Sequence, residues 1–125
     1  MHVESEVAAR IRAVCLGLPE AYEEPAWVGV RWRVRSKTFA HVLVIQDGHP
    51  PAYAKAAGTD GPACVVTFRS AEPDLSRVGP PFFYGGWGRA VIGLVVDEDT
   101  DWDDLTELLI ESYRVLAPRK LGKQV

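Results

Sequence analysis

Three arginines at alternate positions are the residues best placed to do chemistry. Arg31, Arg33 and Arg35 are separated from one another by single apolar residues. In a strand, alternate side chains point to the same face, so the three guanidinium groups would stand in a row about 6–7 Å apart. That spacing is close to the phosphate repeat along one strand of a nucleic acid. The pattern predicts a nucleic-acid-binding stripe, which Lys37 would extend.

An ordinary solvated sheet face, with the arginines paired to glutamates, is the alternative interpretation of this stripe. The chain as a whole carries a net charge of −3 and has a pI near 5.6. This balance argues against a strong non-specific nucleic-acid binder. Phosphate contacts would have to come from a local basic patch, to which the C-terminus adds Arg119, Lys120 and Lys123.

The aromatic segment 82–89 is a second candidate surface. It contains Phe83, Tyr84 and Trp87, and Arg89 lies beside them in the sequence. Aromatic side chains with an arginine can stack on bases or bind a protein partner. We therefore expect these three aromatic residues to be stacking or partner-binding groups and Arg89 to be a nucleic-acid contact. Packing within the core and loops is the alternative.

The acidic run 97–104 has the first three ligands of a calcium loop, Asp97, Asp99 and Asp101. The match then ends, because the sixth position is Trp102 where the turn needs glycine, and the twelfth is Leu108 where the loop needs a bidentate glutamate. Acidic residues in a first helical turn complement the helix dipole. The run is therefore interpreted as the start of a helix, with no metal site.

Catalytic motifs are missing from the sequence. The three histidines have no zinc-motif spacing, and no serine lies in a G-x-S-x-G context. The three glutamates of segment 20–25 could pair as acid and base, but a surface connector of this kind is usually solvated. We expect no enzyme, no catalytic residue and no cofactor.

Two amphipathic helices and four strands are the elements expected to position these residues. The first helix spans 3–18, and the last runs from a cap at Thr100 or Asp101 to Pro118. Strands are expected at 28–35, 38–46, 64–69 and 90–96, with a turn at Ser36-Lys37 and a helical turn within 52–62. Segment 72–78 is expected to be a short helix or turn. The order predicts an α+β fold, with an antiparallel sheet of about four or five strands packed by the two terminal helices.

Length and composition predict one domain over residues 1–125 in the cytoplasm. At 125 residues the chain is too short for two substantial cores. No apolar run approaches the roughly 18–20 residues that cross a bilayer, and the first residues lack the features of a secretory signal. Cys15 and Cys64 fall at apolar positions and are expected to be buried and reduced.

Four runs of sequence resemble the MmcQ/YjbR-like family. They are Leu18-Pro19-Glu20-Ala21-Tyr22-Glu23-Glu24-Pro25, then Trp32-Arg33-Val34 with Ser36-Lys37-Thr38-Phe39-Ala40, then Gly88-Arg89-Ala90-Val91-Ile92-Gly93-Leu94, and Leu109-Ile110-Glu111-Ser112-Tyr113-Arg114-Val115-Leu116. The resemblance implies a frataxin-like α+β arrangement described as a double-wing DNA-binding motif. It carries over no catalytic residue, and Lys37 is its most motif-like charged position.

Two functions follow as hypotheses. The first is a DNA-binding module that uses the basic residues Arg31, Arg33, Arg35, Lys37 and Arg89. The alternative is a non-enzymatic domain that binds a protein partner or a small ligand through the aromatic segment 82–89.

Overall fold

A single six-stranded antiparallel sheet organises the described part of the chain. The computed structural model describes residues 3–70, 79–84 and 90–125. The strand order is β1-β2-β3-β4-β6-β5. Their bounds are β1 Tyr22–Pro25, β2 Val30–Val34, β3 Lys37–Ile45, β4 Ala63–Arg69, β5 Phe82–Phe83 and β6 Val91–Val96. The α+β class and the antiparallel sheet are confirmed, although the expected four or five strands fell short of the six present in these ranges.

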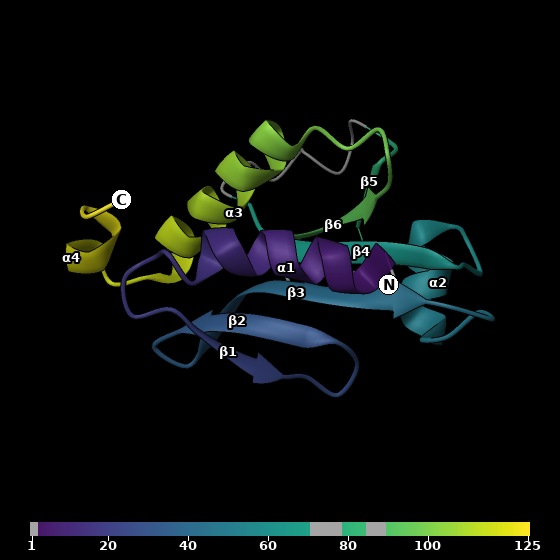
Figure 1. Ribbon diagram of the computed structural model, residues 1–125, viewed down its shortest axis with the longest axis horizontal. Helices are drawn as coiled ribbons and strands as arrows, with labels where there is room; N and C mark the ends of the chain where they lie inside the picture. The colour runs from purple at the N-terminus through teal and green to yellow at the C-terminus, as the bar shows by residue number, and fades with distance from the viewer. Residues whose placement is uncertain (1–2, 71–78, 85–89) are drawn as a thin grey trace.

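Two helices cover one face of the sheet (Figure 1). They are α1, Val3–Cys15, and α3, Trp102–Leu116. Their apolar stripes pack on the inward side chains of the strands, and Ile11, Leu109 and Tyr113 are fully or almost fully buried there. The C-terminal α4, Arg119–Gly122, continues from this layer and buries Leu121 against it.

The opposite face of the sheet, called the open face here, has only the short α2, Pro51–Ala57, packed on it within the described ranges. Leu43, Ile45 and Val65 form a second, smaller core beneath this helix. β3 and β4 are therefore buried on both sides, which explains why the sequence of β3 is apolar on both faces. The helical turn expected within 52–62 is α2, whereas the element expected at 72–78 lies outside the described residues.

In the β2–β3 hairpin, Arg35 lies in the turn, whereas it was expected in the strand. The two turn residues are Arg35 and Ser36, whose φ angles are 49° and 67°. Positive φ at both central positions is the geometry of the tight turn that matches strand twist in a two-residue hairpin. The turn therefore begins one residue earlier than expected, and Arg35 belongs to it instead of to the strand.

A buried serine joins the sheet to α3. The pairing of β2 with β3 shifts register between Trp32 and Arg33, so that Phe39 is an extra residue on β3. The Phe39 carbonyl accepts a 2.6 Å hydrogen bond from the Ser112 hydroxyl, and that hydroxyl accepts one from the Arg69 amide at 2.8 Å. Ser112 is completely buried, so it satisfies two backbone groups that water cannot reach.

The tyrosine next to Ser112 fixes the loop that leads out of α1. Tyr113 is fully buried and packs edge-on against Phe39, with ring centroids 5.5 Å apart. Its hydroxyl donates a 2.7 Å hydrogen bond to the Pro19 carbonyl. The loop that carries Glu20 is therefore held against the C-terminal half of α3.

Three of the observed elements were not predicted. Segment 20–25, expected to be a solvated connector, contains the edge strand β1, and β5 and α4 were also missed. β1 and β5 have four and two residues, too few to show a periodic pattern. Of the two residues expected to cap α3, Thr100 and Asp101, the cap is Asp101, whose side chain accepts a 3.1 Å hydrogen bond from the Asp104 amide.

Replacing Ser112 with alanine should destabilise the fold by about 1–3 kcal/mol, because it leaves the Phe39 carbonyl and the Arg69 amide buried without partners. Chemical denaturation followed by circular dichroism would measure the free energy of unfolding. Thr106→Ala is the matched control, since the hydroxyl of the half-buried Thr106 donates to the Trp102 carbonyl of its own helix and bonds to no other described residue. Equal stability of the Ser112 and Thr106 variants would contradict this account of the helix–sheet contact.

Candidate functional site

Arg31 and Arg33 project from β2 onto the open face, because Trp32 between them is buried beneath the helices. Both are paired with Glu24 of β1, the Arg33 contact being 2.9 Å. Their guanidinium groups, Arg33 first, hold the pKa of the Glu24 carboxyl below its ordinary value. One carboxylate serves two guanidinium groups, so among the residues that the structure describes one positive charge remains uncompensated at this position.

Arg35 extends from the β2–β3 turn and pairs with Glu20. Its guanidinium donates two hydrogen bonds to that carboxylate, at 2.7 and 3.0 Å. The pKa of Glu20 is lowered chiefly by this bond and further by the positive charge of Lys120. Lys120 therefore lies close enough to act on the same carboxylate, which brings α4 near the turn.

Glu23 points to the helix-covered side of β1 and pairs there with α1. Its carboxylate accepts hydrogen bonds from Arg12 at 2.6 and 3.2 Å and from the Trp32 indole at 2.9 Å. The Arg12 bond is the main cause of its lowered pKa. Because consecutive strand residues face opposite ways, Glu23 and Glu24 attach the two sides of β1 to different partners.

The structure therefore matches the interpretation in which the stripe arginines pair with glutamates. The prediction of three guanidinium groups in one row on a strand is correct for Arg31 and Arg33 and wrong for Arg35, which the turn redirects. Lys37, the first residue of β3, is exposed, and no ion pair is seen for it within the described ranges.

An exposed basic end results from the placement of α4 near the β2–β3 turn. In Figure 1 both lie at the left of the molecule. We define the basic end as five exposed residues, Arg35, Lys37, Arg119, Lys120 and Lys123. The C-terminal basic residues thus lie near the hairpin, a proximity that the sequence pattern did not predict.

Acidic residues are concentrated in one segment that starts away from this end. Residues 97–111 hold eight of the seventeen acidic side chains and none of the fourteen lysines and arginines. The remainder of the chain therefore has fourteen basic residues against nine acidic ones. The net charge of −3 conceals a separation of charge between two regions.

Comparison with known proteins is informative at the level of family. A family model described as YjbR matches residues 16–115. The chain belongs to the YjbR family. Among curated proteins and among solved structures, none matches it significantly. The family suggested by the four sequence runs is thereby confirmed.

The aromatic segment of this YjbR-family protein is only partly described. Phe83 is buried, and its ring covers Gly93 so closely that a Cβ at Gly93 would lie 2.3 Å from it. Phe83 is therefore a core-packing residue, the alternative that was considered for the aromatic segment. Tyr84, in contrast, is exposed. The predicted stacking residue Trp87 and the predicted contact Arg89 lie outside the described residues.

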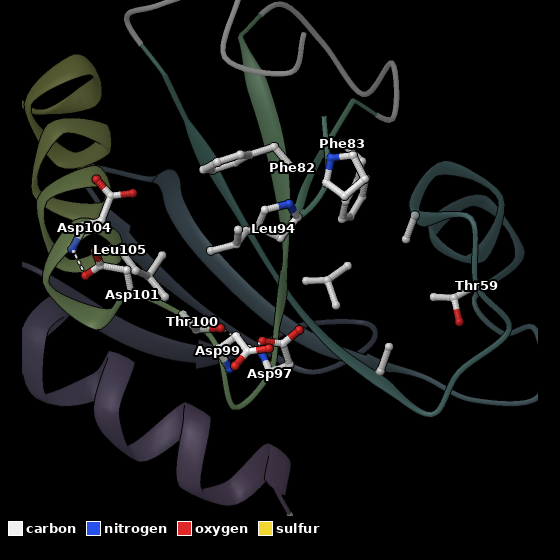
Figure 2. A pocket seen from close by; sticks show the side chains of 15 residues that line it. Thr59, Phe82, Phe83, Leu94, Asp97, Asp99, Thr100, Asp101, Asp104 and Leu105 are labelled. Carbon is white, nitrogen blue, oxygen red and sulfur yellow. Dashed lines mark hydrogen bonds between the residues drawn. The ribbon is translucent and has the colours of Figure 1, made fainter. Parts of the chain in front are cut away.

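An apolar groove with an acidic rim lies at the β5–β6 edge (Figure 2). Its volume is about 730 Å³, and its apolar lining includes Phe82, Leu94 and Leu105. The rim carries four carboxylates, Asp97, Asp99, Asp101 and Asp104. Such a rim repels phosphate and attracts cations.

A smaller hollow on the open face was missed in the sequence. It has a volume of about 360 Å³ and is lined in part by Trp27, Arg31, Thr38, His41 and Tyr53, and we call it the Trp27 hollow. The signal that could have found it is the tryptophan itself, placed in a short loop between two strands. Trp27 is fully exposed, at 101% of its reference area.

No group of three potential metal ligands was found in the described ranges. A separate finding concerns membranes: none of the described helices has the length and apolar character needed to span one.

Acid should weaken the attachment of β1 to α1. The pKa of Glu23 is lowered in the folded state, so its stabilisation is complete above the ordinary value of 4.5 and is lost as the pH falls through the folded-state pKa. Glu23→Gln should cost about 1 kcal/mol at pH 7, discounted for partial exposure, and should make stability less dependent on acid. Urea denaturation across pH would measure both effects.

The exposed Glu107 provides the control, since Glu107→Gln should change neutral-pH stability by less than about 0.5 kcal/mol. A Glu23→Gln variant with the stability of wild type at pH 7 would contradict the role given to this carboxylate.

Proposed function

We propose that this YjbR-family protein is a non-catalytic nucleic-acid-binding module of the cytoplasm, with DNA as the expected ligand. Phosphates would bind at the basic end and along the open face of β2. The double-wing arrangement implied by the family resemblance is part of this proposal. The basic end is the observation that carries it, because it gathers five exposed basic side chains on a chain whose net charge is negative.

The basic end suits phosphate binding because its cations outnumber the acids near them. Glu20 neutralises Arg35, but Lys37 is seen without an ion pair in the described ranges, as are the three basic residues of the C-terminal segment. Arg31 and Arg33 add the charge that Glu24 leaves uncompensated. Along β2 the side chains of Arg31 and Arg33 are about 6–7 Å apart, roughly one phosphate repeat of one strand.

The absence of catalysis is proposed from the chemistry of the candidate nucleophiles. Both cysteines are buried and neither forms a disulfide. Burial first, and the charge of Glu23 second, raises the pKa of the Cys15 thiol. A buried thiol with a raised pKa is a poor nucleophile, and reduced buried cysteines are common in cytosolic proteins.

Charge reversal at the basic end should weaken DNA binding. Fluorescence anisotropy with labelled oligonucleotides would measure affinity at about 50 and 200 mM salt, where four phosphate contacts to a single strand predict a roughly fiftyfold loss. Lys37→Glu and Lys120→Glu should each lower affinity and reduce the slope of log affinity against log salt by about 0.7. Lys55→Glu is the matched control, since Lys55 is exposed, does not line the Trp27 hollow, and belongs to α2, which lies on the opposite side of the molecule from α4 in Figure 1.

A different result from the same titration would overturn the proposal. If folded wild-type protein binds neither single- nor double-stranded DNA at low salt, or if Lys55→Glu weakens binding as much as Lys37→Glu does, the basic end is not a nucleic-acid surface.

The acidic groove supports a second candidate function, the binding of a basic, apolar peptide. Phe82, Leu94 and Leu105 would accept apolar side chains, and the rim carboxylates would accept lysine or arginine. This corresponds to the interaction module considered from the aromatic segment, with the groove as its surface.

Paired substitutions in the first turn of α3 would test the peptide function. Asp104 lines the groove and Asp103 does not, although both are exposed acids of the same helical turn. Asp104→Asn should weaken binding of an arginine- and leucine-containing peptide several-fold more than Asp103→Asn, as measured by isothermal titration calorimetry. Equal effects would show that only the general negative charge attracts the peptide.

A further inference from the structure

The Trp27 hollow combines an exposed aromatic ring with polar groups on the open face of the sheet. Its lining comes from the β1–β2 loop, from β2 and β3, and from α2. At about 360 Å³ it lies at the lower end of the range of small-molecule sites, roughly 300–1,000 Å³. Neither the basic end nor the acidic groove includes any of these residues.

The loop that presents Trp27 is closely held against the sheet. Gly29 has a φ of 80°, and a Cβ there would lie 1.9 Å from the Val42 carbonyl oxygen. Only glycine permits this approach of the two backbones. The Ala26 amide closes the loop with a 3.1 Å hydrogen bond to the Gly29 carbonyl. The loop backbone is therefore fixed, and the fully exposed indole of Trp27 is available for stacking.

Arg31 brings hydrogen-bond donors to the hollow. Its guanidinium shares Glu24 with Arg33, so the carboxylate does not neutralise it fully. Its Nε is buried, and no hydrogen-bond partner is found for it in the part of the chain that the structure describes. The Nε of Arg33 is also buried without a partner in the described residues. Because the Arg31 side chain as a whole is 37% exposed, the accessible part of its guanidinium can donate to an acceptor from a ligand in the hollow.

His41 contributes an acceptor on the neighbouring strand. Its Nε2 lies 2.6 Å from the Val28 carbonyl oxygen. A carbonyl can only accept, so Nε2 carries a proton. Burial, with the charge of Arg31 as a smaller cause, lowers the pKa of His41 and favours the neutral ring, whose Nδ1 is then an acceptor. The ring also packs edge-on against Tyr53, with centroids 6.2 Å apart.

We propose that the Trp27 hollow binds one unpaired nucleobase of a single-stranded nucleic acid. The base stacks on the Trp27 indole, and its polar edge meets donors from Arg31 and an acceptor from His41. A heterocyclic base fits this set because it offers a flat π-face together with both donors and acceptors. This inference rests on the proposed function and adds to it a preference for single strands, since a base inside a duplex is already stacked and paired.

The position of the hollow agrees with the path of the phosphates. Arg31 lies at the hollow, and β2 runs from there past Arg33 to the turn that belongs to the basic end. A strand with one base on Trp27 could therefore place its following phosphates along β2. The base would supply selectivity for single strands, and the basic residues would supply the salt-dependent affinity.

Fluorescence anisotropy with three labelled probes would test this inference. The probes are a short thymidine oligonucleotide, the same oligonucleotide with abasic sites, and a duplex. Trp27→Ala should weaken binding of the thymidine strand by about five- to 150-fold, the usual effect of losing one stacked base, with an unchanged salt slope. Trp27→Phe should retain most of the affinity. Wild type should bind the abasic strand about as weakly as Trp27→Ala binds the intact one.

The possible failures can be told apart. If the thymidine strand binds with the expected salt slope but Trp27→Ala and the abasic strand change nothing, the base site is wrong and the phosphate surface stands. If wild type binds none of the probes, the proposed function fails and the base site fails with it. Circular dichroism would confirm that the Trp27 variants are folded, as expected for an exposed side chain.

Discussion

The candidate surface depends on Glu23 and Glu24, which attach the two faces of β1 to different partners. β1 is an edge strand of four residues, too short to be stable through its backbone pairing alone. Glu23 attaches it to α1 and to the Trp32 indole, and Glu24 attaches it to two arginines on the other face. The same strand begins the hairpin that carries Trp27. These two glutamates therefore position the aromatic ring and determine how much of the arginine charge remains for a ligand.

Acidic and basic side chains lie at opposite ends of α3. α3 begins among the carboxylates of segment 97–104 and ends close to the basic C-terminal segment, so acidic side chains lie at its positive dipole end. The arrangement stabilises the helix and also keeps the six acidic side chains of this segment away from the β2–β3 hairpin. A phosphate backbone approaching the molecule would be attracted to one region and repelled by the other, which orients the encounter.

Long periodic elements could be predicted from the sequence, whereas features that depend on tertiary contacts could not. Local sequence patterns were enough to predict the two main helices, the Asp101 cap, the central strands and the family. β1 was missed because Glu23 and Glu24 show no apolar alternation, and their pairing partners lie elsewhere in the chain. Arg35 was assigned to the strand because the turn was predicted one residue too late. The Trp27 hollow combines Trp27, His41 and Tyr53 from separate elements, which no local pattern could bring together.

The central claim is that nucleic acid binds along β2 between the Trp27 hollow and the basic end. The most direct test is a nuclear magnetic resonance titration of isotope-labelled protein with a short thymidine oligonucleotide, followed through the backbone amides. We predict that shifts concentrate at residues 26–41 and 119–123 and leave residues 97–108 unchanged. Shifts confined to residues 97–108, or none at saturating oligonucleotide, would contradict the account.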